Sequence, residues 1–182
     1  MVITNKFDDL HENWMDQEHY DVIANISKLY DYNSIMVEIG SWKGRSAILF
    51  LQSNLKIHLF CLDIWPEVIE SNFIRNINRF NLNNRITMIK DKSKNIRKYF
   101  SSKSVDFIYL DACHKESSVY WDLITCFAIL KENAFVLGDD WQKKTVQQAV
   151  RIVVDQGFYN IEWTKNYTFL LKKIRDKSKI FL

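Results

Sequence analysis

Short apolar runs alternate along this chain with longer segments in which apolar residues recur at the spacing of a helix. Five of the short runs predict strands, most of which end at a glycine or an acidic residue: Ile35–Gly40, Ile57–Asp63, Arg85–Lys90, Val105–Asp111 and Ala134–Asp139. The longer segments predict helices: Lys43–Ser53, Glu67–Asn81, Ser93–Phe100, Lys115–Leu130 and Trp141–Asp155. This alternation is typical of a parallel sheet with helices on both faces, which binds ligands at the carboxyl ends of its strands.

The pattern changes after Gly157, where two β-rich segments, Phe158–Trp163 and Thr168–Ile174, flank a turn signal. These segments predict an antiparallel hairpin. Added to five parallel strands, the hairpin completes a seven-stranded mixed sheet, which differs from a plain dinucleotide-binding fold. Residues 1–34 carry aromatic and apolar side chains among polar ones, and they predict an N-terminal helical lead or lid before a core at 35–174.

The composition is that of one globular domain. The 182 residues have a mass of 21.8 kDa, so we expect a single domain over 1–182. Hydrophobic residues make up 47% of the chain, which excludes a disordered protein. No apolar run approaches the roughly 20 residues of a membrane span, and no run of like charges indicates a nucleic-acid partner. Three distant cysteines without a CxxC pair fit reduced thiols in the cytoplasm.

The segment Val37–Ser46 joins the first strand to the next helix and places Gly40 and Gly44 where a backbone can approach a ligand closely. A dinucleotide fingerprint would have two further glycines here, but Trp42 and an arginine stand in their places. The segment therefore argues against NAD or FAD. Glu38 suits a ligand with positive charge, such as a sulfonium or an amino group, although pairing with a basic neighbour is an equal alternative.

The second and third strands also end in polar residues. Asp63 ends the second strand at about the spacing, roughly 20 residues after the glycine loop, at which an acidic residue binds ribose hydroxyls in doubly wound folds. Capping the next helix is its alternative role. Ile64 and Trp65 follow and offer apolar faces for an adenine ring. The third strand ends with Asp91 and Ser93, of which Ser93 could instead cap a helix.

In this order the segments resemble the small class I S-adenosylmethionine-dependent methyltransferases related to catechol and macrolide-sugar O-methyltransferases, over Trp14–Ile174. The family's first motif resembles Val37–Ser46, and its ribose acid resembles Asp63. Its adenine-side Gly-Asp-Ser resembles Lys90–Ser93, with the glycine lost and one residue inserted. The resemblance implies a Rossmann-like class I methyltransferase sandwich with S-adenosylmethionine as cofactor. The residues expected to bind that cofactor are Glu38, Gly40, Ser41, Gly44, Ser46, Asp63, Ile64, Trp65, Asp91, Ser93 and Asp111.

Acidic residues end the remaining two parallel strands, with Asp111 on the fourth and Asp139 and Asp140 on the fifth. Three carboxylates at one edge repel one another unless a cation joins them, so we expect them to bind Mg²⁺. In the families resembled, the metal ligands lie at these strand ends, and the base lies three residues after the first acid, which is His114 here. In the alternative, Asp111 binds cofactor, the other two acids cap a helix, and His114 is a surface histidine.

Other polar residues near these motifs are expected to be structural. Glu116 departs from the family pattern, which commonly has an aromatic residue two places after the histidine, so the substrate side is expected to differ. Cys113 is expected to be a buried strand-end thiol. His11, His19 and His58 carry no motif, and we expect them to be solvated.

The expected reaction is methyl transfer to a hydroxyl of a small molecule, such as a sugar or another polyol. The base and Mg²⁺ would activate that hydroxyl. No large insertion builds a pocket, so residues 1–34 or a second subunit of a homo-oligomer would close the site. A non-catalytic S-adenosylmethionine-binding module in a larger assembly is the main alternative. A nucleic-acid methyltransferase is less well supported, because a basic stripe and an N-P-P-Y-like motif are absent from the sequence.

Overall fold

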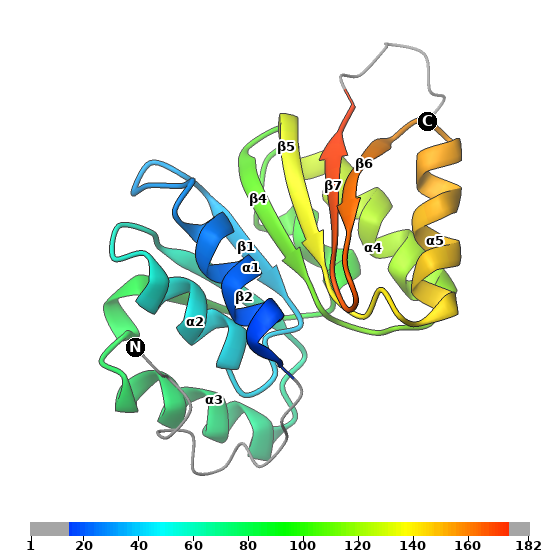
Figure 1. Cartoon of the computed structure of the whole chain (residues 1–182). Helices are drawn as coiled ribbons and strands as arrows, with labels where there is room; N and C mark the ends of the chain where they lie inside the picture. Colours follow the sequence, from blue (N-terminus) through cyan, green and yellow to red (C-terminus); the bar gives the residue numbers. More distant parts are fainter. Residues whose placement is uncertain (1–14, 175–182) are drawn as a thin grey trace.

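The computed structural model describes residues 15–174, which form a seven-stranded sheet with helices on both faces (Figure 1). The strands are β1 (Met36–Ile39), β2 (Leu59–Asp63), β3 (Ile86–Lys90), β4 (Val105–Leu110), β5 (Leu130–Gly138), β6 (Tyr159–Thr164) and β7 (Phe169–Lys173). Their order across the sheet is β3-β2-β1-β4-β5-β7-β6. Strands β1 to β5 are parallel, and β7 runs antiparallel to both β5 and β6. The predicted mixed sheet with its C-terminal hairpin is confirmed.

The helices are α1 (Gln17–Ser27), α2 (Arg45–Ser53), α3 (Glu67–Arg79), α4 (Glu116–Ile129) and α5 (Lys144–Asp155), with 3₁₀ turns η2 (Asn83–Arg85) and η3 (Ser93–Lys98). Side chains alternate along each strand, so each face of the sheet has its own core. Met36 packs with α1, α2 and α3, whereas Val37 packs with η3, α4 and α5. Within residues 15–174, no helix combines the length and apolar character needed to cross a membrane.

Helix α1 lies within the segment predicted as a helical lead. The Asp16 side chain caps it by accepting a hydrogen bond from the His19 amide. Val22, Ile23 and Ile26 are buried on one side of the helix, at the spacing that packs it against α2. Residues 1–14 of that predicted segment, among them His11 and Trp14, lie outside the described residues.

Two predicted elements differ from the structure, one in its helix type and one in its first residue. The segment predicted as a helix at Ser93–Phe100 is the 3₁₀ turn η3, in which Ile96 is the one buried residue. With Phe100 after it, the predicted segment buries two apolar side chains, which is too small an apolar face to hold an amphipathic α-helix against the sheet. Strand β5 begins at Leu130 instead of Ala134, because Leu130 already pairs with Val105 of β4 where α4 ends.

The strand ends that carry the site are joined by backbone hydrogen bonds. The Gly40 amide donates to Leu62 of β2, and the Asp111 amide donates to Ile39 of β1. The Asp139 amide donates to Leu110 of β4 at 3.1 Å. The ends of β2, β1, β4 and β5 therefore form one continuous edge, to which the motif residues belong.

Candidate active site

Two glycines shape the loop between β1 and α2. Gly40 has a φ of 92°, and a Cβ atom there would lie 2.0 Å from the carbonyl oxygen of Asp111. Gly44 has a φ of 86°, and a Cβ atom there would lie 3.0 Å from the Phe73 ring. Both conformations are unfavourable for residues with a Cβ atom. The loop backbone thus lies directly against the end of β4, and a ligand at this edge could approach it closely.

Glu38 lies fully buried beneath this loop. Its Oε1 accepts a hydrogen bond from the Ser46 hydroxyl at the start of α2. Its partner is thus a hydroxyl and not the basic residue of the alternative interpretation. Glu38 Oε2 and the buried Ser41 hydroxyl have no hydrogen-bond partner among residues 15–174. Burial raises the pKa of Glu38 to about 7, against the Ser41 and Ser46 hydroxyls and the Cys61 thiol, which lie close to the carboxyl and lower its pKa. Buried polar atoms without partners are rare, so this pair is a candidate contact for a ligand.

Asp63 holds the loop in place from the end of β2. Its Oδ2 accepts from the Trp42 amide at 2.8 Å, and its Oδ1 accepts from the Trp65 amide at 3.0 Å. Helix α3 begins after Pro66, so Asp63 does not cap it. Each carboxylate oxygen has a second lone pair that can accept from a ribose hydroxyl.

Replacing Asp63 with alanine is expected to weaken S-adenosylhomocysteine binding by about 1 to 3 kcal/mol, because ribose hydroxyls would lose their acceptor. Calorimetric titration of Asp63→Ala measures this change. The unfolding midpoint of the variant separates lost binding from a loosened loop, because Asp63 also holds two amides. Unchanged affinity would leave Asp63 with a structural role only.

The prediction that adenine lies on Trp65 is wrong. The Trp65 ring is fully buried against Phe73, with ring centroids 4.7 Å apart, and its Nε1 donates to the Trp42 carbonyl. No face of the ring is therefore open to a ligand. Ile64 beside it is 60% exposed, so it can offer an apolar contact at this edge. Trp65 instead helps to fix the loop that carries Trp42.

The end of β3 holds the other residues expected on the adenine side. Asp91 accepts from the Asn95 amide group, the Lys92 backbone amide and the Tyr99 hydroxyl. These hydrogen bonds lower the pKa of Asp91 to about 2. The Ser93 side chain does not cap η3 but hydrogen-bonds to the buried carboxyl of Asp122, whose pKa burial raises to about 6. Both polar groups that were expected to face the cofactor therefore have protein partners.

A second cluster forms where β4 and β5 end, with ligand atoms of Asp111, His114 and Asp140 all within 4.8 Å of one another. His114 Nδ1 lies 2.7 Å from Asp140 Oδ2, and Lys143 Nζ lies 2.8 Å from the same oxygen. Burial raises the pKa of Asp140, but His114 and Lys143 outweigh it and lower the pKa to about 2. Asp140 is therefore an ionised carboxylate that accepts from His114 Nδ1.

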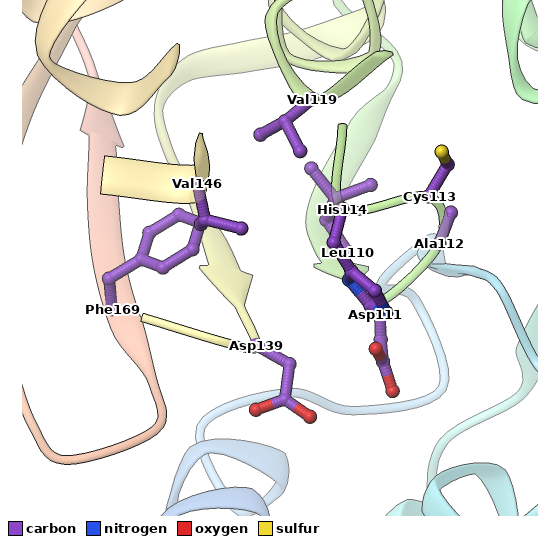
Figure 2. Close-up of a pocket in the computed structure, with 9 residues that line it drawn as sticks. All are labelled: Leu110, Asp111, Ala112, Cys113, His114, Val119, Asp139, Val146 and Phe169. Carbon is purple, nitrogen blue, oxygen red and sulfur yellow. The ribbon is translucent and has the colours of Figure 1, made fainter. Parts of the chain in front are cut away.

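Asp111 lies deepest in this cluster. Burial and the charges of Asp139 and Asp140 raise the pKa of Asp111 well above its usual range. Figure 2 shows the Asp111 and Asp139 carboxylates extending to the same side of the strand ends. The pocket is lined by residues from β4 and the segment after it, the end of β5, helices α4 and α5, and strand β7. These residues are Leu110, Asp111, Ala112, Cys113, His114, Val119, Asp139, Val146 and Phe169.

Asp139 does not join the metal-ligand geometry predicted for three acids. Its Oδ1 accepts from His19 Nε2 at 2.9 Å and from the Asp140 amide at 2.8 Å. The group that could hold a cation is instead Asp111, His114 and Asp140. Three acids were expected to lack a counter-charge, whereas His19, His114 and Lys143 lie beside them.

His19 was predicted to be solvated, and it is buried, with 2% of its surface exposed. Its two ring nitrogens face carboxylates, Asp16 at 3.0 Å and Asp139 at 2.9 Å, so both donate. Burial lowers the pKa of His19, but the two aspartates outweigh it and raise the pKa to about 9. Asp16 lies three residues before His19, which is the spacing of a helix N-cap, and this spacing in the sequence could have indicated that the two residues interact.

Two other predictions, one at this edge and one at the opposite end of the strands, are tested by exposure. Cys113 is exposed instead of buried, because it follows the end of β4 and its side chain points away from Asp139 (Figure 2). Hydrogen bonds from Ser118 and the Lys115 amide lower the pKa of its thiol. His58 is half-buried and bonds to Thr87 across β2 and β3 at 2.8 Å.

The sheet order and the loop at the end of β1 define a class I S-adenosylmethionine-dependent methyltransferase fold. Residues 37–141, more than half of the chain, match the family described as a methyltransferase domain, and the chain belongs to this family. No match was found among curated proteins.

Solved structures of methyltransferases share this fold. The O-methyltransferase from Bacillus cereus, in complex with SAH, has 16% identity and a TM-score of 0.68, over 88% of this chain and 82% of that one. An S-adenosylmethionine-dependent O-methyltransferase from Thermotoga maritima has 15% identity and a TM-score of 0.71, over 91% and 68%. The precorrin-6y C5,15-methyltransferase from Geobacter metallireducens has 15% identity and a TM-score of 0.69, over 89% and 90%. At these identities the likeness shows the fold alone.

Proposed function

We propose that this protein transfers a methyl group from S-adenosylmethionine to a hydroxyl of a small molecule. One observation carries the proposal: the unpartnered Glu38 carboxyl oxygen and the His114–Asp140 pair lie at ends of the strand group β1, β4 and β5. A cofactor above Glu38 and an acceptor beside His114 would therefore be neighbours. Two structural neighbours are described as O-methyltransferases, which favours oxygen as the acceptor atom.

In this proposal His114 is the general base. Asp140 accepts from Nδ1 of the ring, so Nε2 is left to take the proton of the acceptor hydroxyl. Lys143 keeps Asp140 ionised, and an ionised carboxylate stabilises the imidazolium that the proton transfer creates. S-adenosylmethionine, when bound, would supply the methyl group to the deprotonated oxygen, and its sulfur would keep the electron pair of the broken carbon–sulfur bond as a thioether. The protein contributes alignment and deprotonation.

The strand-end acids also fit a divalent cation in part. Asp111 and Asp140 offer carboxylate oxygens close together, which is the chemistry that Mg²⁺ prefers. Asp139 was proposed as a third ligand, but its Oδ1 already accepts from His19 and from a backbone amide. Imidazole is an uncommon ligand for Mg²⁺, which is consistent with His114 as the base. A bound Mg²⁺ would lower the pKa of the acceptor hydroxyl.

A sugar or other small polyol is the proposed acceptor, since the carboxylates of Asp111 and Asp139 and the imidazole of His114 line this edge and suit hydroxyl groups. A homo-oligomer that contributes residues to this edge remains part of the proposal, as does a cytoplasmic location.

Methyl transfer from labelled S-adenosylmethionine to a panel of sugars, catechols and other hydroxyl compounds tests the proposal. Transfer to one class, with equal formation of S-adenosylhomocysteine, is the expected result. A non-catalytic binding module would bind S-adenosylhomocysteine and methylate none of the panel. Transfer to RNA or DNA at low salt, with none to small molecules, would favour the nucleic-acid alternative.

A further inference from the structure

A chain of hydrogen bonds links helix α1 to the proposed base. His19 bonds to Asp16 through Nδ1 at 3.0 Å and to Asp139 through Nε2 at 2.9 Å. The same Asp139 oxygen accepts from the Asp140 amide at 2.8 Å. Asp140 Oδ2 in turn forms an ion pair with His114, whose Nδ1 lies 2.7 Å away. Each link joins directly to the next, from the outer surface of α1 to the imidazole at the end of β4.

The middle of this chain holds a strained residue. Asp140 has a φ of 63°, in the left-handed region that favours glycine. Such a conformation is unfavourable for a residue with a Cβ atom and persists where surrounding contacts hold it. The bond from the Asp140 amide to Asp139 Oδ1 is one of these contacts, and His19 fixes the Asp139 carboxylate that provides it. The position of His19 is therefore transmitted to the carboxylate that orients His114.

Neighbours of His19 fasten α1 over the same edge. Glu18 accepts from the Asn166 side chain in the turn between β6 and β7 at 3.2 Å. The Tyr20 hydroxyl accepts from Arg45 Nε at 3.1 Å, at the first residue of α2. Three consecutive residues of α1 thus contact the hairpin turn, the end of β5 and the start of α2. A helix held at three points can place His19 reproducibly.

We propose that His19 is a positioning residue for the base His114 and acts through Asp139 and Asp140. Its hydrogen bonds go to Asp16 and Asp139, its ring packs against Tyr167, and it is 2% exposed, so it acts on the geometry of the base and not on the reacting atoms. The proposal rests on the proposed function, because the role of His114 as a base belongs to that function. It also assigns α1 to the acceptor side of the site.

Two variants separate the bonds of His19. In His19→Gln the side-chain amide can donate where Nε2 does, toward Asp139, whereas in His19→Asn it can donate where Nδ1 does, toward Asp16. If the bond to Asp139 matters, turnover should fall about 10- to 100-fold in His19→Asn and stay within about 3-fold of the original in His19→Gln. S-adenosylhomocysteine affinity should change by less than about 3-fold in both. His58→Gln, at a distant strand pair, is the matched control with unchanged turnover.

Amide exchange in the ligand-free protein provides a readout that needs no turnover. The Asp140 amide should exchange at least about 10-fold faster in His19→Asn, while in His19→Gln and in Asp16→Asn it should stay protected. Equal exchange at Asp140 in His19→Asn and the original protein would overturn the proposal, as would a His19→Gln variant as impaired as His19→Asn. If the original protein methylates nothing and binds no S-adenosylhomocysteine, the proposed function fails. Exchange at Asp140 would still decide whether His19 positions this segment.

Discussion

His114→Ala is expected to slow methyl transfer about 10²- to 10⁴-fold, which is the usual contribution of a general base. His114 has an oriented Nδ1, since Asp140 lies 2.7 Å from it, and alanine removes the group that would take the acceptor's proton. Affinity for S-adenosylhomocysteine should be unchanged, because Glu38, Gly40 and Asp63, which are proposed to hold the cofactor, lie at the ends of β1 and β2. Steady-state turnover and calorimetric titration on the same preparation measure both quantities.

The neighbouring Cys113 provides the matched control. It is exposed and points away from Asp139, although it lies at the rim of the same pocket, so Cys113→Ala should cost far less turnover than His114→Ala. A His114→Ala variant that methylates the accepted substrate at the original rate would contradict the assignment of the base. Equal losses in both variants would indicate a disturbed segment after β4 rather than a missing base.

Excess EDTA is expected to abolish methyl transfer, and added Mg²⁺ is expected to restore it. Carboxylate oxygens of Asp111 and Asp140 lie close enough to bind one cation, and a bound cation would lower the pKa of the acceptor hydroxyl. Asp140→Ala should lose most activity and no longer respond to Mg²⁺, while S-adenosylhomocysteine still binds. Turnover titrated against Mg²⁺ after removal of metal measures the response.

Ca²⁺ is a useful control for this prediction, because it binds oxygen ligands with a larger and more flexible geometry than Mg²⁺. It should restore less activity than Mg²⁺ at equal occupancy. Full turnover in EDTA would contradict a metal-assisted reaction and leave His114 to activate the hydroxyl alone. In that case Lys143, 2.8 Å from Asp140, is the cation that balances the carboxylates.

The fold could be predicted from the sequence because it depends on local patterns. Each buried strand reads as an apolar run, and Gly40 and Gly44 occupy positions where a Cβ atom would clash or strain the backbone. The exceptions are segments whose structure depends on partners elsewhere. Leu130 belongs to β5 because it pairs with Val105, and η3 is a 3₁₀ turn because it buries little apolar surface.

The candidate site was predicted less completely, because side-chain partners come from distant parts of the chain. Sequence spacing placed Asp111, His114 and Asp140 at one edge, and the structure brings them together. Sequence spacing could not show that Asp139 is bound by His19, which is 120 residues away in sequence. Nor could it show that Trp65 faces Phe73 and the core, since an aromatic residue after a strand can face either way.

The central claim is that the loop between β1 and α2, with Glu38 and Asp63, binds S-adenosylmethionine. Unfolding of the protein with S-adenosylhomocysteine, and separately with NAD, tests this claim most directly. At about 100 times its Kd, S-adenosylhomocysteine should raise the free energy of unfolding by roughly 2.7 kcal/mol, and NAD should leave it unchanged. Stabilisation by NAD, with none by S-adenosylhomocysteine, would contradict the assignment of this site.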